Sequence, residues 1–484
     1  MNSLSITEKY LLDTVSKISK SKKYTVYIVG GILRDHLLKR EKERKDFDFC
    51  LQKGAMNLAK DLARKIKGAF IVLDRERGIY RVVYGKAGKK YSLDFNNFRA
   101  PSLEEDLKKR DFTINAFAVE IDNFLNKDLE KNIRDPFNGL VDLRNKIIRT
   151  FSKESFLDDP LRILRAFSLK AQLGFRIEMH TLNFIKSLRK YLTGVSYERI
   201  RDELVKILFT EESYSVLKEM FNLGILDIII PDLRQMDKVA QGPYHHLDVL
   251  SHSFETLKQL EILLNNVKAD SDLYNYMHEY ISGDHKRFVL LKLAAFLHDI
   301  GKPEAKILRS GKIIFHGHEL KGVKKIRKIC YSLKLSSRES QMLETIIMWH
   351  LRPGYLADME VLTKKALFRF FRDASDDAPS ILLLSIADQR STRGPLTAGA
   401  NRVHHEKTCI KLIKKYFDTK KQKPIIPLIN GHDLISKLKL KEGPLVGKVL
   451  KKVFELQALG KIKTKSEALS AAKKIATAKK REKL

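Results

Sequence analysis

The chain has 484 residues, of which 43% are hydrophobic and 31% are charged. A single hydrophobic core rarely serves more than about 250–300 residues, so a chain of this length is expected to fold as several domains. Lysine and arginine together number 92 against 59 aspartates and glutamates, which gives a formal net charge of +33. This surplus favours a polyanionic partner, above all nucleic acid, with a merely lysine-rich composition as the alternative.

Several classes of protein are disfavoured at once. No apolar run reaches the roughly 20 residues that a membrane-spanning helix needs, and the opening MNSLSITEKY lacks the apolar segment of a secretion signal. Cys50, Cys330 and Cys409 are too few and too far apart for a disulfide framework or a zinc ribbon. We therefore expect a cytoplasmic protein that has no membrane partner.

The first 150 residues mix strand and helix signals. Residues 24–29 (KYTVYI) predict a buried strand, which is followed by two glycines and by ILRDHLL, the expected start of a helix. Residues 45–51 (KDFDFCL) alternate acidic with apolar residues, a pattern typical of a half-buried strand. Further strands are predicted at 69–73, 80–85, 91–95 and, after a helical start, within 112–121. This segment is therefore expected to be an α/β domain with a mixed sheet.

After about residue 150, helical periodicity dominates. Residues 161–175 and 198–209 are amphipathic at helical spacing. Breaks are predicted at QGPYHH (241–246) and in the proline-containing segment 420–433, and the chain ends in a basic segment, KKIATAKKREKL, which is expected to be solvated. The whole chain is therefore expected to be α+β and mostly α.

The sharpest group of residues lies near the N-terminus. Asp46 and Asp48 are two positions apart on a predicted strand, so their carboxylates point to the same side. They repel each other unless a cation lies between them, and a pair of Mg²⁺ ions could activate an attacking hydroxyl and stabilise a leaving pyrophosphate. Just upstream, Gly30 and Gly31 allow backbone amides to approach a triphosphate, and Arg34 can bind its phosphates. A surface pair of acids is the alternative.

Two later segments carry further candidates for binding a nucleotide. Arg110 and Asp111 are adjacent and opposite in charge, so they can meet a phosphate and a ribose hydroxyl, with a surface salt pair as the alternative. Arg162 and Arg165 lie about one turn apart on one helix face, with Asp159 at or near the helix cap. A carboxylate and a guanidinium there can present hydrogen-bonding groups to a base edge. The alternative is a capped helix with a solvated basic face.

In order and spacing these segments resemble the class II tRNA nucleotidyltransferases and bacterial poly(A) polymerases. The matching segments are VGGILRD with DFDF, LKKRDFTINAFA (107–118), DPFNGLVDL (135–143), DDPLRILRA (158–166) and SYERIRDEL (196–204). They cover about the first 210 residues, and the later blocks resemble the longer members that carry an HD domain. The resemblance implies a template-independent enzyme that adds CMP and AMP from CTP and ATP to tRNA 3′ ends.

The resemblance also implies residue roles. Asp159 and Arg162 would read the base, so that protein groups act as the template, while Arg165 would support the nucleotide. The chain departs from the family at Ser168, where an arginine is usual, so one arginine that contacts the nucleotide is absent. Asp94, in the strand-like segment YSLDF, is the candidate for a third metal-binding carboxylate, although it could equally be a buried or edge acid.

A block of histidines follows the order of the HD phosphohydrolase pattern. The residues expected to bind one divalent ion are His252, His298, Asp299 and Asp388. His318 and His350 lie between them in the sequence and could hold a second ion. Imidazoles and carboxylates together suit several transition metals, so the metal is not identified. A further His-Asp pair at 432–433 is better interpreted as a helix start that Asp433 caps.

We therefore expect a catalytic head at 1–150, an RNA-binding neck that selects the nucleotide at 151–238, an HD domain at 239–400 and a basic, RNA-binding helical tail at 401–484. The leading prediction is CCA addition, or only its CC or A part, with Mg²⁺ at the head. The alternatives are a poly(A) polymerase, an HD phosphohydrolase with an inert head, and a non-catalytic RNA-binding protein. The intact Asp46, Asp48, Arg110 and Arg162 argue against the last two.

Overall fold

The computed structural model describes residues 4–40, 46–86, 89–125, 129–395, 399–422 and 425–481. Lys45 of the predicted strand and the last three residues of the basic C-terminal segment lie outside these ranges. The chain divides into two compact units. The first comprises Met1–Thr210 with Glu219–Ile228, and the second comprises Glu211–Lys218 with Ile229–Leu484.

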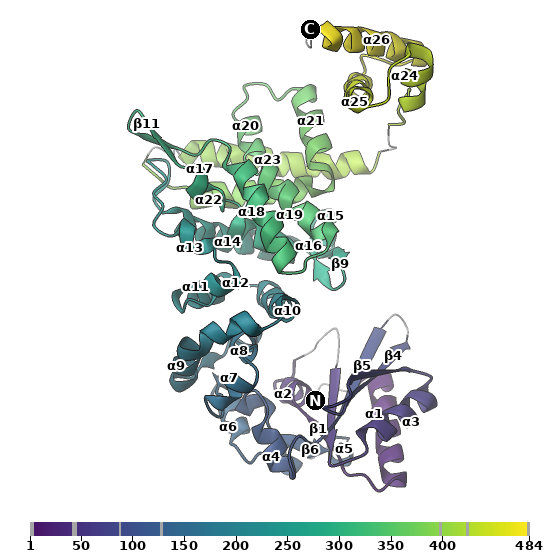
Figure 1. The fold of residues 1–484 in the computed structure, drawn as a ribbon, viewed down its shortest axis with the longest axis vertical. Helices are drawn as coiled ribbons and strands as arrows, with labels where there is room; N and C mark the ends of the chain where they lie inside the picture. Colours follow the sequence, from purple (N-terminus) through teal and green to yellow (C-terminus); the bar gives the residue numbers. More distant parts are fainter. Residues whose placement is uncertain are drawn as a thin grey trace. The chain divides into compact units, whose positions relative to one another are not determined.

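A six-stranded mixed sheet forms the base of the first unit, in the order β3-β4-β5-β2-β1-β6 (Figure 1). The strands are β1 (Val26–Val29), β2 (Asp46–Leu51), β3 (Ala69–Asp74), β4 (Ile79–Lys86), β5 (Lys89–Asn97) and β6 (Ala118–Glu120). Neighbouring strands are antiparallel except β2 and β5, which run parallel with Asp48 opposite Asp94. The predicted mixed sheet is confirmed.

Alternation along β2 determines which side chains enter the core. Phe47 and Phe49 are fully buried, and Phe49 stacks on Phe95 of β5 with 4.8 Å between ring centroids. Helix α3 (Ala55–Ile66) packs against β4 and β5, and α1 (Ile6–Ser21) packs against α3. Because side chains alternate along a strand, Asp46 and Asp48 lie on the face opposite to these phenylalanines.

Short helices and a helical extension complete the first unit. They are α2 (Gly31–Leu37), α4 (Leu103–Lys108), α5 (Ile121–Phe124), α6 (Gly139–Arg144), α7 (Glu154–Asp158), α8 (Arg162–Leu173), α9 (Met179–Leu188) and α10 (Tyr197–Leu208), with α11 (Tyr214–Asn222) and α12 (Leu226–Ile229) at the border between the units. A two-residue parallel pair, β7 (Ile147–Ile148) and β8 (Arg176–Ile177), lies among them. Helix α8 packs along α10 and ends at Gly174, which has a φ of +68°.

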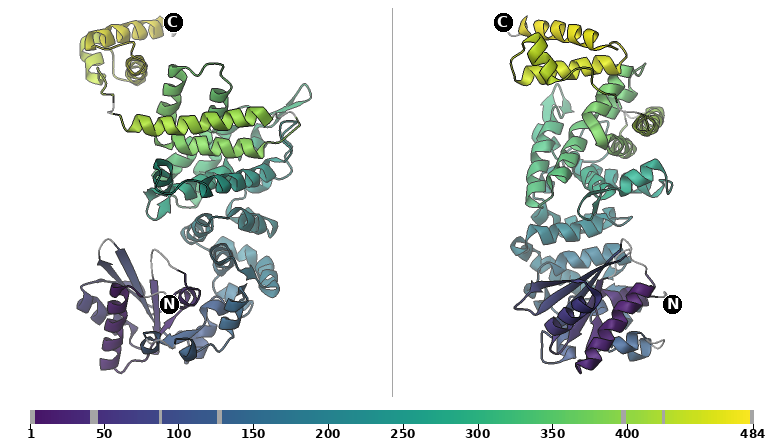
Figure 2. Two further views of the ribbon diagram at one scale, coloured as in Figure 1. Left: turned by 180° about the vertical axis from the view of Figure 1, so that it is seen from behind. Right: turned by 90° about the vertical axis from the view of Figure 1, so that its right-hand side faces the viewer.

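The second unit is mostly helical, as the sequence predicted. Its helices are α13 (Leu233–Met236), α14 (Val249–Asn265), α15 (Asp272–His278), α16 (Arg287–Leu297), α17 (Lys302–Ala305), α18 (His318–Ser332), α19 (Ser337–Trp349), α20 (Arg352–Ala357), α21 (Lys364–Ala374), α22 (Ala378–Ser391), α23 (Gly399–Lys420), α24 (Gly431–Leu438), α25 (Pro444–Ala458) and α26 (Lys465–Arg481). Figure 2 shows α23 running alongside α22. Two hairpins that the sequence did not reveal are β9 (Tyr280–Ser282) with β10 (His285–Lys286) and β11 (Ile307–Arg309) with β12 (Lys312–Ile314).

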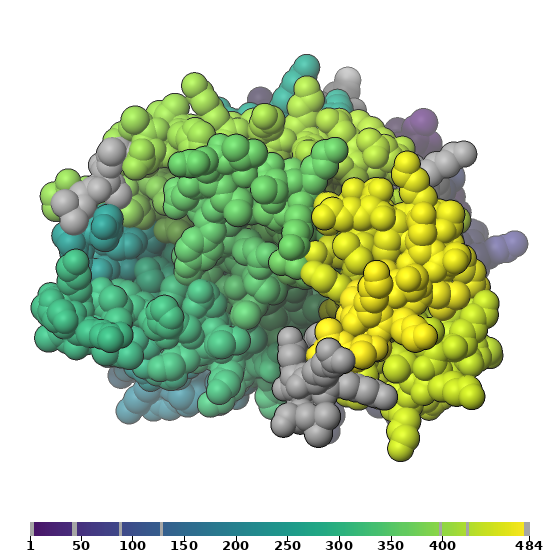
Figure 3. All heavy atoms as spheres, turned by 90° about the horizontal axis from the view of Figure 1, so that it is seen from above, coloured from purple at the N-terminus to yellow at the C-terminus, as the bar shows by residue number. Residues whose placement is uncertain are grey.

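The last three helices share an apolar cluster of their own, which includes Leu434, Val449 and Ala472. Their outer face, at the yellow end of the colour bar, is visible in Figure 3. Glu455 of α25 accepts two hydrogen bonds from Arg369 of α21, at 2.9 and 3.0 Å.

At the start of α24 the N-cap is Asn430, and Asp433 is the third residue of a capping box rather than the cap itself. None of the helices in the described ranges is long and apolar enough to cross a membrane.

Candidate active site

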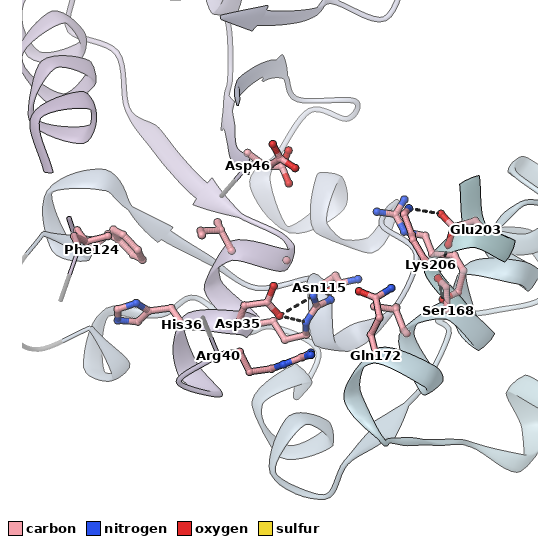
Figure 4. Close-up of a pocket in the computed structure, with 17 residues that line it drawn as sticks. Asp35, His36, Arg40, Asp46, Asn115, Phe124, Ser168, Gln172, Glu203 and Lys206 are labelled. Carbon is pink, nitrogen blue, oxygen red and sulfur yellow. Dashed lines mark hydrogen bonds and ion pairs between the residues drawn. The ribbon is translucent and has the colours of Figure 1, made fainter. Parts of the chain in front are cut away.

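Three carboxylates line up on the open face of the sheet. Asp46 and Asp48 project from β2, and the parallel register places Asp94 of β5 directly beside Asp48. Asp46 and Asp48 line a pocket of about 260 Å³, and Figure 4 shows Asp46 on one side of it and Ser168 and Lys206 on another. The sequence predicted this group of acids, and the fold brings them together.

Glycine is required at position 30 for two reasons. Its φ is +77°, a region that other residues rarely adopt. A Cβ atom there would lie 3.1 Å from Asp48 Oδ2 and 3.4 Å from Arg110 Nη1. The turn between β1 and α2 therefore lies close against a carboxylate and a guanidinium. Gly31, the next residue, lines the pocket itself.

The surroundings of Asp48 disfavour its negative charge. Burial, reinforced by the neighbouring Asp94, raises the pKa of Asp48 to about 6, although Arg110 and Arg165 act in the opposite direction. A carboxylate that is costly to ionise is stabilised when a cation binds beside it. Asp46 and Asp48 are therefore the candidates for oxygen ligands to a hard divalent ion, with Asp94 beside them.

Asp94 has a partner that the sequence gave no sign of. Arg81 of β4 donates two hydrogen bonds to its carboxylate, both 2.7 Å long. This bidentate pair forms because Arg81 and Asp94 are register partners on antiparallel strands. Asp94 thus lies beside Asp48 as expected, with both of its oxygens already bound to an arginine.

A chain of buried polar contacts links the motifs to one another. Arg34 donates from Nε and Nη2 to Asp35 Oδ1, and from Nη1 to Asn115 Oδ1 at 2.6 Å. Asn115 in turn donates to Asp111 Oδ1 at 3.0 Å, and Asp111 Oδ2 lies 3.0 Å from Arg165 Nε. The donors of Arg34 are therefore directed at protein groups, so its role in binding phosphates stays a prediction. Asn115 was not among the predicted residues, although it connects two of them.

The two residues predicted to read the base lie outside the 260 Å³ pocket. Arg162 donates to the backbone carbonyl of Lys109 at 2.7 Å and to Ser155 Oγ at 2.6 Å, so it joins α8 to the segment that carries Arg110. Asp159 accepts hydrogen bonds from the Leu161 amide and from Arg199, at 3.2 and 2.8 Å. It precedes the helix by three residues, because α8 begins only at Arg162.

The pocket wall around Ser168 differs from the family pattern in a definable way. The Ser168 hydroxyl donates to the buried carboxylate of Glu203 on α10. The other oxygen of Glu203 accepts a 2.7 Å hydrogen bond from Lys206, whose side chain is half exposed. Lys206, which was not among the predicted residues, therefore adds a positive charge to this wall of the pocket, which Arg165 also lines.

The histidine block also assembles in three dimensions. His252 Nε2 on α14 lies 2.9 Å from Asp388 Oδ1 on α22, and His298 Nε2 lies 3.1 Å from Asp299 Oδ2. His318 approaches the other oxygen of Asp299 at 3.4 Å. All of these side chains are almost fully buried, and Asp388 is the most exposed at 18%.

Two overlapping sets of potential metal ligands result, His252 with His298 and Asp299, and Asp299 with His318 and His350. Burial, with positive neighbours, lowers the pKa of His350 to about 3, so its imidazole is neutral and able to ligate at physiological pH. Burial would raise the pKa of Asp299, but His298 and Lys302 outweigh it and hold that pKa well below the usual range. The residues thus fit a divalent ion.

Comparison with known proteins places the chain in a family. The sequence matches the poly A polymerase head domain over residues 26–149, a probable RNA- and SrmB-binding site of polymerase A over 174–236 and the HD domain over 249–393. An A-adding tRNA nucleotidyltransferase of Deinococcus radiodurans is 30% identical over 448 residues, which cover 91% of this chain and 93% of that protein. The chain belongs to the tRNA nucleotidyltransferase family.

Other members of this family are similar over most of their length. A CC-adding tRNA nucleotidyltransferase of Thermus thermophilus is 28% identical over 449 residues, which cover 91% of each protein. The solved structure of the Thermotoga maritima CCA-adding enzyme in complex with tRNA is 22% identical, with a TM-score of 0.60 over 97% of this chain and 96% of that one. At this identity the likeness shows a shared fold.

Proposed function

We propose that this tRNA nucleotidyltransferase adds CMP, AMP or both, from CTP and ATP, to the 3′ ends of tRNA without a template. The observation that carries the proposal is that Asp46 and Asp48 line one pocket, while Gly30 lies close against Asp48 and Arg110. Relatives named for A addition and for CC addition align over nine-tenths of the chain, which supports tRNA as the acceptor.

The reaction joins the RNA 3′ oxygen to the α-phosphorus of the nucleotide and releases pyrophosphate. In the proposal, Asp46 and Asp48 would hold Mg²⁺, which would supply activation of the 3′ hydroxyl and neutralisation of charge on the leaving pyrophosphate. The Gly30–Gly31 turn brings backbone amides near the triphosphate. Asp111 fixes Arg165, and Arg110 and Arg165 add positive charge beside Asp48, where charge on the phosphates develops.

Nucleotide choice is proposed to lie at the start of α8. Arg162 donates a hydrogen bond to the carbonyl of Lys109, and Asp159 accepts one from Arg199. To recognise a base, both side chains would have to exchange these contacts for hydrogen bonds to CTP or ATP. A site that hydrogen-bonds the correct base leaves groups unpaired when the wrong base enters, and this unpaired state provides selectivity. The positive charge of Lys206, in the pocket wall beside Glu203, would complement the negative phosphates of the nucleotide.

The decisive experiment supplies labelled CTP and ATP with a panel of RNAs. Transfer RNAs that end before the first C, after CC, or in complete CCA are compared with an unrelated RNA of equal length. Incorporation restricted to incomplete tRNAs supports the proposal and identifies the added nucleotides. Long A tails on the unrelated RNA would instead indicate a poly(A) polymerase.

A second candidate function belongs to the histidine cluster, because its carboxylates and imidazoles converge independently of the head. We propose that His252, His298, Asp299 and Asp388 hold a divalent ion that supports hydrolysis of phosphate esters. Release of phosphate from p-nitrophenyl phosphate, and its loss in His298→Ala, tests this activity.

The remaining assignments follow the same proposal. The residues divide into a catalytic head (1–150), a neck that selects the nucleotide and binds RNA (151–238), an HD domain (239–400) and a basic tail that binds RNA (401–484). The cysteines Cys50, Cys330 and Cys409 are free and buried, as expected in a reducing compartment. We propose a cytoplasmic location, in keeping with the relatives that act on tRNA.

A further inference from the structure

A buried carboxylate lies behind Arg110, outside the pocket that Asp46 and Asp48 line. Asp106 of α4 is 2% exposed, and its Oδ1 accepts hydrogen bonds from the backbone amide and from Nε of Arg99, at 2.9 and 3.1 Å. Its Oδ2 lies 3.6 Å from Arg110 Nη2 and accepts no hydrogen bond within the described chain. One oxygen of Asp106 is therefore fixed by Arg99, and the other faces Arg110.

The guanidinium of Arg110 also borders the catalytic acids. Arg110 Nη1 and Asp48 Oδ2 lie 3.4 and 3.1 Å from the position that a Cβ atom would take on Gly30. The thiol of Cys50 lies near Arg110 as well, but burial raises the pKa of this thiol to about 12, so it stays neutral. Two carboxylates, those of Asp48 and Asp106, thus attract the same guanidinium.

The backbone of Arg110 is held independently of its side chain. Its amide donates to the carbonyl of Leu107 at 3.1 Å, at the end of α4. The carbonyls of Lys109 and Arg110 accept hydrogen bonds from Arg162, at 2.7 and 3.2 Å. The charges around the guanidinium therefore decide where it points. A cation bound at Asp48 would repel Arg110, so a second carboxylate is needed to keep the arginine beside the site.

We propose that Asp106 is a positioning residue, which holds Arg110 beside Asp48 for the phosphates of the incoming nucleotide. The inference rests on the proposed nucleotide addition and adds to it a residue outside the pocket. Burial would raise the pKa of Asp106, but Arg99 and Arg110 outweigh it and lower that pKa, so the carboxylate is charged at neutral pH. A cationic donor that is oriented before the nucleotide arrives costs no reorganisation during the reaction.

The first measurement is the binding of labelled CTP and ATP to the full-length protein by equilibrium dialysis. Asp106→Asn keeps the size of the side chain and an acceptor for Arg99, but removes the charge that faces Arg110. We expect the Kd for the bound nucleotide to rise about tenfold, as for the loss of a contact between charged groups. Glu104→Gln removes an exposed acid from the same helix and is the matched control, which should bind as the wild type does.

A double-mutant cycle separates positioning from a structural role. If Asp106 acts through Arg110, its replacement should matter little once Arg110 is gone. We therefore expect Asp106→Asn to change the Kd of Arg110→Ala by less than about twofold, against about tenfold in the wild type. A residue that only stabilises α4 would weaken binding by the same factor in both backgrounds.

Circular dichroism and melting temperatures establish that each variant is folded. If Asp106→Asn does not fold, Asp106→Glu takes its place, because it keeps the charge but displaces it. It should weaken nucleotide binding about threefold, again only where Arg110 is present. Equal weakening in both backgrounds, or unchanged binding in Asp106→Asn, overturns the inference and leaves the proposed function intact. A wild type that adds no nucleotide to any incomplete tRNA overturns the proposed function instead.

Discussion

Replacing Asp48 by asparagine should abolish catalysis and yet stabilise the metal-free protein. Burial beside Asp94 raises the pKa of Asp48 from 3.8 to about 6. At neutral pH this shift of about 2 units corresponds to about 3 kcal/mol of unfavourable free energy in the folded state. Asp48 keeps some contact with solvent, so screening reduces the expected gain to about 1–2 kcal/mol.

The sign of the pH dependence follows from the direction of the shift. The folded pKa lies above the unfolded one, so the cost is absent near pH 3, develops between about pH 4 and 6 and is complete at neutral pH. For a unit of this size, about 1–2 kcal/mol corresponds to a rise of roughly 2–8 °C in melting temperature. Calorimetry of chelator-treated wild type and Asp48→Asn at pH 7 and pH 3.5 measures the difference.

Asp46→Asn is the matched control, because Asp46 lies on the same strand but is exposed. It should lose activity without a comparable gain in stability. The reasoning is refuted if Asp48→Asn melts below the wild type at pH 7, or if its advantage is equally large at pH 3.5. Either result would mean that the carboxylate of Asp48 makes favourable contacts in the metal-free site.

The remaining predictions concern other parts of the molecule. Asp159→Ala or Arg162→Ala should reduce the selectivity among nucleotides more than it slows incorporation. Competition among all four nucleotides measures this selectivity, and unchanged selectivity in both variants would contradict the prediction. His298→Ala should remove the ion held with His252, Asp299 and Asp388 and leave CTP and ATP incorporation largely intact. Loss of incorporation would show that the two sites are coupled. The affinity of the head for Mn²⁺ should fall by up to about tenfold for each pH unit below pH 6, because protons compete with the ion for the carboxylate of Asp48. This affinity is measured by titrating Mn²⁺ into Asp299→Asn, which lacks a ligand of the histidine cluster.

The sequence was informative wherever chemistry depends on local spacing. The alternation in DFDF predicted the strand, the buried phenylalanines and the shared face of Asp46 and Asp48, all of which depend only on the two-residue period of a strand. The order of His252, His298-Asp299 and Asp388 likewise predicted residues that the fold brings together.

The rest depended on long-range register, which no local pattern contains. Arg81 meets Asp94 only because β4 and β5 pair in one register. Asn115 connects Arg34 to Asp111 from a turn whose conformation the sequence does not determine. Lys302 was visible in the HDIGKP segment, but its contact with Gln241 requires the packing of distant segments. The predicted phosphate contact of Arg34 had the same weakness, since the sequence could not show that Asp35 and Asn115 take its donors.

The most direct test of the account measures nucleotide addition and pyrophosphate release together. Wild type and Asp46→Ala are incubated with Mg²⁺, labelled CTP and ATP, and tRNA that lacks its 3′ terminal CCA or only its final A. We expect the wild type to extend at least one of these tRNAs and to release one pyrophosphate for each nucleotide added, while Asp46→Ala binds tRNA but adds nothing. Addition at a near-normal rate by Asp46→Ala, or no addition to any incomplete tRNA by the wild type, would contradict it.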